Sequence, residues 1–343
     1  MRIVLDAMGS DKYPGPEIEA AIQLARGGGV EIILVGNERV VKPGLDALKA
    51  TDVNLPIVHA PEMVDMAEKP AAAARGKAEN SMAVGMELVK RGEADAFVTA
   101  GNTGGALANA LFHLGRIRGV KRPGIGAPFP VKGGSCVLID IGANAECKPE
   151  YLLQFAIMGS LYAEKVFGVH RPRVGLLSNG EEAGKGNDLV KGTYPLLASS
   201  SLNFIGNVEG KEFFGGQADV VVTDGFTGNI VLKSAEAVAK LLTETIRDEI
   251  KSNPITAIGG RLAQPAFKRV RRVLDPSEQG AAPLLGVDGL VFIGHGRSDA
   301  RALVNAVGTA RRAIESGLLA ALRAELSSRL NETEAALEPA AAH

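Results

Sequence analysis

A lysine of this 343-residue sequence lies in a glycine-rich loop of the kind that binds phosphate. Lys185 stands between two glycines in Ser178-Asn-Gly-Glu-Glu-Ala-Gly-Lys-Gly-Asn187, after an apolar run. A helix that follows such a loop offers unpaired backbone N–H groups to an anion, but its dipole adds only about 0.3 to 1 kcal/mol, so a cation is also needed. The position of Lys185 therefore favours phosphate binding over an ordinary solvated loop lysine.

Aspartates and asparagines gather at other loops of the same kind. Asp6, Asn144, Asp224 and Asn229 each follow a short apolar run. Any one of them is explained by turn and capping chemistry, but several at one cleft favour a ligand site. His295, in Gly294-His-Gly-Arg-Ser-Asp299, has two interpretations: a turn residue beside a helix cap, or a side chain that faces the cleft together with Arg297.

The motifs of common nucleotide-binding and hydrolytic enzymes are not met. The spacing from Gly180 to Gly184 is one residue too short for the P-loop pattern G-x-x-x-x-G-K-[ST], and Gly186 replaces its hydroxyl residue. Gly124-Ile-Gly126 is followed by Pro128, which argues against a dinucleotide fingerprint. The patterns G-x-S-x-G and H-E-x-x-H do not occur. We therefore predict neither a metal nor a cofactor.

The composition is that of a soluble globular protein. Hydrophobic residues make up 46% of the chain, and 38 basic and 39 acidic residues give a formal net charge of -1, which argues against a general attraction to nucleic acid. Cys136 and Cys147 lack zinc-site spacing, and Cys136 is expected to be a packed core thiol. With no secretory segment at the start and no apolar stretch near the roughly 20 residues that span a bilayer, we expect a cytoplasmic protein.

Six small-residue loops follow short apolar runs, and they set the expected architecture. Such runs are typical of buried parallel strands, and ligands bind outside the carboxyl ends of these strands. We therefore expect an α/β fold with a Rossmann-like, mainly parallel sheet, helices on both faces, and the six loops at one sheet edge. The expected strands lie near residues 2–5, 31–35, 95–99, 135–140, 173–177, 202–206, 218–223 and 290–294, and the clearest helices over 16–26, 70–91, 150–167, 229–251 and 298–330.

Residues 1–330 are predicted to form a single domain, with one excursion and a disordered tail. The excursion, residues 253–279, contains no predicted strand, and Pro265 predicts a bent pair of short helices rather than one helix. The tail, residues 331–343, is rich in Ala and Glu and offers no apolar face.

The order and spacing of six short motifs resemble the bacterial phosphate acyltransferases of the PlsX type, acyl-ACP:phosphate acyltransferases. The motifs are Asp6-Ala-Met-Gly-Ser-Asp11, Ala100-Gly-Asn-Thr-Gly104, Asp140-Ile-Gly-Ala-Asn144, Gly206-Asn-Val-Glu209, Thr223-Asp-Gly-Phe-Thr-Gly-Asn229 and His295-Gly-Arg-Ser298. This resemblance implies a fold similar to that of isocitrate and isopropylmalate dehydrogenases and a homodimer. It also implies transfer of a fatty acyl group from acyl carrier protein to inorganic phosphate, for use by a glycerol-3-phosphate acyltransferase.

The resemblance also implies roles for individual residues. Lys185 would hold the phosphate, and Asn229 would stabilise the oxyanion that forms when phosphate attacks the thioester. Phosphate is then the nucleophile, so no Ser or Cys acyl-enzyme is needed. The further substrate-binding residues implied are Asp6, Gly9, Asn102, Thr103, Gly104, Asn144, Asn187, Asp224, Gly225, Thr227, Gly228 and His295.

Apolar residues alternate with five cations in the excursion. This pattern is typical of a segment that lies on an anionic membrane, and the resemblance implies such a partly membrane-associated dimer tip. A dimer arm with a solvated basic face, or a docking site for the acidic carrier protein, would show the same pattern.

Two other functions stay open at this point. A nicotinamide-dependent hydroxyacid dehydrogenase would share the expected fold, although the sequence shows no cofactor fingerprint. A non-catalytic, membrane-associated binding protein would hold phosphate or an acyl ligand without turnover.

Overall fold

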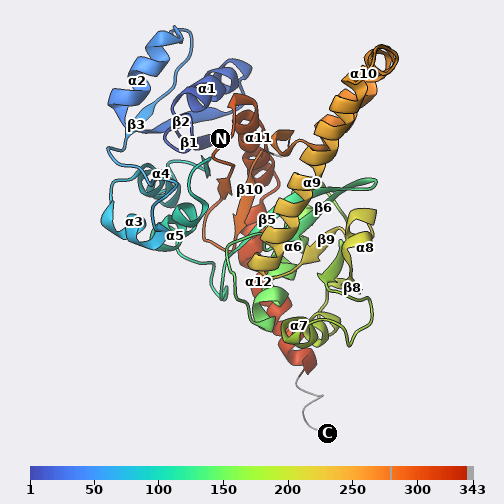
Figure 1. Ribbon diagram of the computed structural model, residues 1–343. Helices are drawn as coiled ribbons and strands as arrows, with labels where there is room; N and C mark the ends of the chain where they lie inside the picture. Colours follow the sequence, from blue (N-terminus) through green and yellow to red (C-terminus); the bar gives the residue numbers. More distant parts are fainter. Residues whose placement is uncertain (279, 338–343) are drawn as a thin grey trace.

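Residues 1–278 and 280–337 are described by the structure, a computed structural model, and in them eleven strands form one sheet (Figure 1). The strand order is β3-β2-β1-β4-β11-β10-β5-β6-β9-β7-β8. The strands are β1 (Arg2–Asp6), β2 (Glu31–Gly36), β3 (Ile57–His59), β4 (Ala96–Thr99), β5 (Gly124–Val131), β6 (Gly134–Ile139), β7 (Arg173–Leu177), β8 (Asn203–Val208), β9 (Val220–Val222), β10 (Ala282–Leu285) and β11 (Val291–Ile293).

The sheet contains two parallel groups that run in opposite directions. Strands β1 to β4 and β11 are parallel to one another, and so are β6 to β9. The antiparallel strands β10 and β5 lie between the groups and reverse the direction. The predicted α/β class with a mainly parallel sheet is confirmed, but the prediction that all six loops share one sheet edge is wrong, because their strands fall in both groups.

Helices cover both faces of the sheet because successive strand residues point to different cores. In β1, Ile3 and Leu5 pack in one core with Ile18 and Leu303, whereas Val4 packs in a second core. The helices are α1 (Gly15–Gly27), α2 (Glu38–Ala47), α3 (Pro70–Gly76), α4 (Ser81–Lys90), α5 (Thr103–His113), α6 (Pro149–Phe167), α7 (Asp188–Ala198), α8 (Gly210–Gly215), α9 (Gly225–Lys251), α10 (Pro254–Leu274), α11 (Ala300–Glu315) and α12 (Leu318–Leu337). A 3-10 turn, η1 (Pro276–Glu278), follows α10. Burial of apolar side chains on both faces, each worth about 1.5 to 3 kcal/mol, stabilises this layered arrangement.

The alternation continues in β6, where Cys136 and Leu138 point away from Val137 and Ile139. Cys136 is fully buried, which confirms the prediction of a core thiol.

Two predicted helices are each divided by a capping residue. The helix expected over residues 70–91 is α3 followed by α4, and Asn80 caps α4 by accepting a hydrogen bond from Ala83 N at 3.0 Å. The helix expected over residues 298–330 is α11 followed by α12, with Gly317 between them at φ +67°. A left-handed residue ends a helix readily when it is glycine.

Helices α9 and α10 form an antiparallel arm that projects from the rest of the molecule (Figure 1). α10 is one helix with Pro265 inside it, so the predicted bent pair of short helices is wrong. At the other end of the chain, α12 continues past residue 331 to Leu337, where a disordered tail had been expected, and residues 338–343 lie outside the described part. No helix among the described residues is long and apolar enough to cross a membrane.

Candidate active site

The two opposed groups of strands end beside the same central strand pair. The last residue of β11, Ile293, pairs with Ala282 of β10, and the last residue of β6, Ile139, pairs with Gly126 of β5. Because β10 pairs with β5, the loops that follow β11 and β6 approach one another from opposite directions. The carboxyl ends of both groups therefore meet in the middle of the sheet rather than along one edge.

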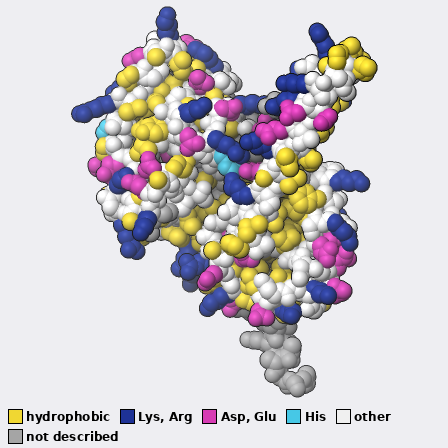
Figure 2. All heavy atoms as spheres, in the orientation of Figure 1, with side chains coloured by type: hydrophobic (Ala, Val, Ile, Leu, Met, Phe, Trp, Pro, Cys, Tyr) yellow, Lys and Arg dark blue, Asp and Glu magenta, His cyan; other side chains and the backbone are white. Residues whose placement is uncertain are grey.

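A cavity of about 880 Å³ lies where these loops meet α9. We call it the α9 cavity, and Figure 2 shows hydrophobic side chains along α9 and in the hollow beside it. Thr103, Gly142, Asn229 and His295 supply polar groups to its wall. Its apolar wall includes Ile125, Ala127, Pro128, Phe129, Ile141, Phe214, Ile230, Val231, Val238, Leu242, Ala281 and Ile293.

The helix predicted to begin at Asn229 begins four residues earlier, at Gly225, so Asn229 is the fifth residue of α9. It is exposed, and its Nδ2 lies 3.9 Å from the position that a Cβ on Gly142 would take. The helix begins earlier because Asp224 caps it, accepting hydrogen bonds from Thr227 N and Thr227 Oγ1, both at 2.8 Å. The side-chain amide of Asn229 is therefore aimed at the loop after β6.

Two glycines let the first turn of α9 pack directly on that loop. A Cβ on Gly225 would lie 2.6 Å from Asn144 O, and a Cβ on Gly228 would lie 1.9 Å from Asp140 O. Gly225 N also donates a hydrogen bond to Asn144 O at 2.8 Å. Both glycines are thus required for close packing.

Asp140 is the centre of the loop after β6. Its two carboxylate oxygens accept hydrogen bonds from Ile125 N, Gly142 N, Ala143 N, Asn144 N and Asn144 Nδ2, at 2.8 to 3.1 Å. Asn144 Nδ2 also donates to Pro123 O at 2.7 Å. Asp140 and Asn144 therefore fix the backbone of a loop whose Ile141 and Gly142 line the α9 cavity.

The loops after β1 and β4 are joined in a similar way. The buried Asp6 accepts hydrogen bonds from Met8 N at 3.0 Å and from Thr99 Oγ1 at 2.7 Å. Burial raises the pKa of the Asp6 carboxyl, although these hydrogen bonds oppose the rise. A Cβ on Gly9 would lie 2.9 Å from Gly101 N. Asp6 and Gly9 thus hold loops together rather than line the α9 cavity.

Asn102 caps the helix that brings Thr103 to the cavity. Its Oδ1 accepts a hydrogen bond from Gly105 N at 2.9 Å, and its Nδ2 donates to Met66 O at 3.1 Å. Gly104 follows Thr103 in the first turn of α5.

Lys185 and Asn187 lie in the exposed loop after β7. Lys185 N donates to Glu182 O at 3.0 Å, and the Lys185 side chain lies over Gly180, whose Cβ position is 2.6 Å from Lys185 Cγ. Asn187 caps α7 through Val190 N at 3.0 Å. Neither residue is among those that line the α9 cavity, so the structure brings together Asn229, Thr103 and His295 but not Lys185.

Glu236 of α9 is a polar residue of this region that the sequence analysis missed. Its carboxylate lies 3.6 Å from His295 Nε2, 3.3 Å from Arg297 Nη2 and 3.5 Å from Lys233 Nζ. Burial lowers the pKa of His295, and the charge of Glu236 opposes this shift. His295 and Arg297 thus both face α9. The available signal was helical spacing, because Asn229, Lys233 and Glu236 repeat at intervals of four and three residues.

The charged side chains continue into a second hollow of about 530 Å³, between α9 and the loop after β11. Its lining includes Lys240, Glu244, Arg247, Arg297 and Asp299, and it shares Lys233, Glu236 and His295 with the α9 cavity. One end of the apolar cavity is therefore bordered by paired charges.

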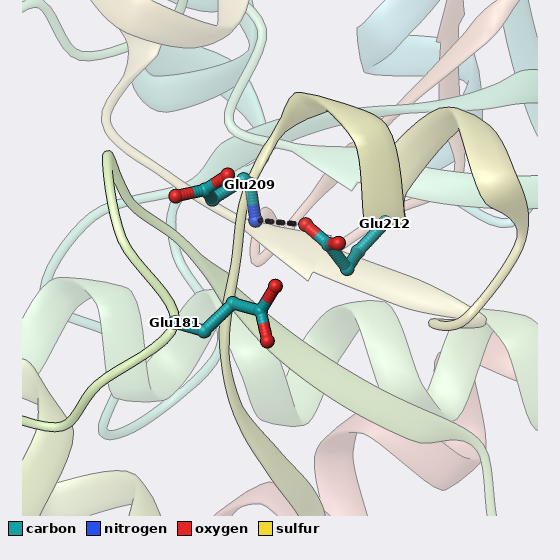
Figure 3. A group of neighbouring side chains, drawn as sticks. All are labelled: Glu181, Glu209 and Glu212. Carbon is teal, nitrogen blue, oxygen red and sulfur yellow. Dashed lines mark hydrogen bonds between the residues drawn. The ribbon is translucent and has the colours of Figure 1, made fainter.

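Three glutamates cluster elsewhere, beside α8: Glu181, Glu209 and Glu212 (Figure 3). Glu209 N donates to Glu212 Oε2 at 3.1 Å as part of a helix-capping box. Lys211 Nζ lies 3.0 Å from Glu181 Oε1 and 3.1 Å from Glu212 Oε1. The single ammonium group of Lys211 offsets part of the negative charge of the three carboxylates.

The sequence is similar to a known protein family and to named members of bacterial proteomes. The profile of a family described as "Fatty acid synthesis protein" matches residues 1–321. The chain is 50% identical to the phosphate acyltransferase of Elusimicrobium minutum over 328 residues, which cover 95% of this chain and 96% of that protein. It is 46% identical to the phosphate acyltransferase of Pelotomaculum thermopropionicum over 328 residues, with 96% of each chain covered.

Solved structures of low sequence identity share the fold. A phosphotransacetylase from Streptococcus pyogenes aligns with a TM-score of 0.62 at 20% identity, over 92% of this chain and 94% of that chain. A 4-hydroxythreonine-4-phosphate dehydrogenase from Klebsiella pneumoniae aligns with a TM-score of 0.56 at 13% identity, over 91% of this chain and 99% of that chain. The fold alone thus accommodates both acyl transfer and dehydrogenation.

Proposed function

Because the chain belongs to the family of fatty acid synthesis proteins and is an acyltransferase that uses phosphate, we propose that its acyl donor is acyl carrier protein and that the acyl chain of this donor lies in the α9 cavity. One observation carries this proposal. The wall of the α9 cavity is mainly apolar, and Thr103, Asn229 and His295 add polar groups to it. A fatty acyl thioester has the same distribution, with an apolar chain and one polar reacting group.

Direct attack by phosphate is favoured over a cysteine acyl-enzyme. Burial raises the pKa of Cys136 to about 12 and that of Cys147 to about 12, so both stay protonated at neutral pH. The thiolate, not the thiol, is the nucleophilic form. Phosphate would therefore attack the thioester carbonyl itself, forming the P–O–C bond of acyl phosphate and releasing the carrier thiolate, which takes up a proton.

We propose that Asn229 stabilises the oxyanion that forms in this reaction. Its Nδ2 is an N–H donor that faces the loop after β6, and it belongs to a helix whose first turn is fixed by the contacts of Gly225 and Gly228. A donor held in place before the reaction stabilises developing charge most effectively.

We propose that Lys185 and Asn187, in the loop after β7, bind the phosphate. Strand β7, which precedes this loop, is parallel to β6 and β9. The carboxyl end of β7 therefore lies on the same side of the sheet as the carboxyl ends of β6 and β9. Lys185→Ala would raise the KM for phosphate more than it lowers kcat. The remaining predicted substrate-binding residues, Asp6, Gly9, Asn102, Gly104, Asn144, Asp224, Gly225, Thr227 and Gly228, would act by holding the loops in place.

The α9–α10 arm is proposed to form a homodimer and to touch a membrane surface. Ile255, Ile258 and Leu262 are 83%, 65% and 79% exposed, and the same helix carries Arg261 and Lys268. Exposed apolar residues beside cations suit an anionic membrane, whereas the apolar face of α9 suits a second copy. The enzyme would be cytoplasmic and partly membrane-associated, and it would deliver acyl phosphate to a glycerol-3-phosphate acyltransferase.

We further propose that residues 1–330 are one domain of the isocitrate and isopropylmalate dehydrogenase fold. Among functions of this fold, acyl transfer is favoured over a nicotinamide-dependent reaction, because relatives of 46% and 50% identity bear the acyltransferase name.

Purified protein incubated with hexadecanoyl acyl carrier protein and phosphate, then quenched with hydroxylamine, tests the function. We expect a fatty hydroxamate in amounts that depend on added phosphate. Product without phosphate, or no product, would reject the assignment. Addition of NAD should change nothing.

A further inference from the structure

The loop between α5 and β5 concentrates positive charge. Arg116, Arg118, Lys121 and Arg122 are all exposed and lie within seven residues of a chain whose net charge is -1. We call residues 116–122 the basic loop. Ion pairs occupy many other cations of the described chain, but none of them includes a residue of the basic loop. Its charge is therefore available to a partner.

The backbone of the basic loop is held firmly by one buried side chain. Gln154 of α6 is 2% exposed, its Oε1 accepts from Lys121 N at 2.8 Å, and its Nε2 donates to Gly119 O at 3.0 Å. Ile117 and Val120, between the cations, point into the core. The four cations thus project from a fixed frame, which lowers the entropy lost when a partner binds.

The surface around the loop is concave. A hollow of about 500 Å³ is lined by Leu111, Arg116, Lys121, Arg122, Pro123 and Tyr151. Three cations therefore surround a floor that is partly apolar, a form that suits a small convex protein surface with carboxylates on it.

The basic loop lies directly beside the candidate active site. Pro123 O accepts the hydrogen bond from Asn144 Nδ2, and Asn144 belongs to the loop whose Gly142 lines the α9 cavity. Ile125, which follows in β5, lines the same cavity. A partner bound at the basic loop would stand next to the place where its acyl group must react.

We propose that the basic loop is the docking surface for the acidic acyl carrier protein, an inference that rests on the proposed function. Carboxylates of the carrier pair with the four cations, and the thioester arm reaches past Pro123 into the α9 cavity. Electrostatic attraction of this kind raises the rate of association and weakens with salt. The cations of α10, on the projecting arm, are then not the carrier site.

Charge reversal at two positions of the basic loop tests this assignment. In Arg118→Glu/Lys121→Glu, we expect kcat/KM for hexadecanoyl acyl carrier protein to fall by about tenfold or more. The value for a small hexadecanoyl thioester of N-acetylcysteamine should stay unchanged, because that donor has no protein surface. Arg261→Glu/Lys268→Glu on α10 is the matched control, with the same change of charge, and should leave both values unchanged.

The opposite pattern would overturn the docking site. Loss of carrier activity in the α10 variant alone would place the carrier on the arm, and an equal loss with the small thioester would show damage to the active site.

Calorimetric titration with the carrier protein separates the proposed docking site from the proposed function. If wild-type protein transfers no acyl group to phosphate, the proposed function fails, whereas unweakened carrier binding by the basic-loop variant rejects docking whatever the activity. Loss of binding to anionic phosphatidylglycerol vesicles, without loss of carrier binding, would assign the loop to a membrane.

Discussion

Asn229 is the residue on which the proposed chemistry depends most. Asn229→Ala removes one hydrogen-bond donor to the oxyanion, which typically costs about 2.7 to 4 kcal/mol, so kcat should fall by roughly 10²- to 10³-fold. Steady-state kinetics of acyl phosphate formation measure this loss. Asn203→Ala, in an asparagine that bonds Arg171 O and does not line the cavity, is the control with an expected change below about twofold. Normal turnover in a folded Asn229→Ala protein would remove Asn229 from the mechanism.

A buried carboxyl under the loop after β1 gives a prediction about stability. Glu17 Oε1 accepts a hydrogen bond from Ser10 N at 2.8 Å, whereas the buried Glu17 Oε2 and Ser10 Oγ have no hydrogen-bond partner in the described part of the chain. Burial raises the pKa of Glu17 from 4.5 to about 7. The folded chain therefore keeps a proton that the unfolded chain has released, and the stability supplied by this group is full below pH 4.5 and is lost as the pH rises toward 7.

Glu17→Gln should remove that loss, since an amide keeps an acceptor for Ser10 N and carries no charge. We expect the free energy of unfolding to rise by up to roughly 3 kcal/mol at pH 8 and to change little at pH 5. Urea denaturation at both pH values measures the difference. The same gain at both, or none at pH 8, would show that ionisation of Glu17 is not the cause.

The first turn of α9 is the element that places Asn229, and Gly228 makes its position possible. Because a Cβ there would lie 1.9 Å from Asp140 O, Gly228→Ala should displace the helix start and cost about 3 kcal/mol of stability or more. Gly259→Ala is the control, since nothing lies within 4 Å of its Cβ position in α10 and alanine is the better helix former. Thermal unfolding of the two variants should shift in opposite directions, and similar midpoints for both would contradict the packing argument.

Strand β5 was not predicted from the sequence. Most predicted strands are confirmed within a few residues, but Gly124, Pro128 and Pro130 make β5 read as a loop. Among the described residues, β10 pairs with β5 only as far as Ile125, so the later part of β5 is a local edge where proline is tolerated. The start of α9 was predicted at Asn229, four residues too late, for a related reason, since Gly225 and Gly228 hide the helix start. Contacts with Asp140 and Asn144, which lie far away in sequence, require these glycines.

The opposed strand groups are a property of the whole molecule that local patterns do not contain. Strand direction depends on which strands pair, and the two strands that reverse it, β5 and β10, were not predicted; the short edge strand β3 was missed as well. Of the loops recognised from their composition, those after β4 and β6 contribute Thr103 and Gly142 to the lining of the α9 cavity. This arrangement also separates Lys185 from the lining of the α9 cavity.

Because α9 of the arm exposes apolar side chains, we expect the protein to form a dimer. Leu241 of α9 is 62% exposed on the face proposed for the second copy, so Leu241→Arg should convert dimers to monomers at micromolar concentration. Light scattering after size exclusion gives the mass directly. Ile205→Arg, at a position 39% exposed and distant from the arm in sequence, should leave the mass unchanged. A monomeric wild-type protein would reject the dimer.

The central claim is that the acyl chain lies in the α9 cavity while phosphate attacks. A hexadecanoyl acyl carrier protein with a diazirine in its chain, irradiated with the enzyme and digested for mass spectrometry, tests this most directly. We predict labels on β5, on the loop after β6 and on α9, at residues such as Phe129, Ile141 and Val231. Excess unlabelled donor should suppress these labels. Labels confined to other parts of the chain, with none on α9, would contradict the claim.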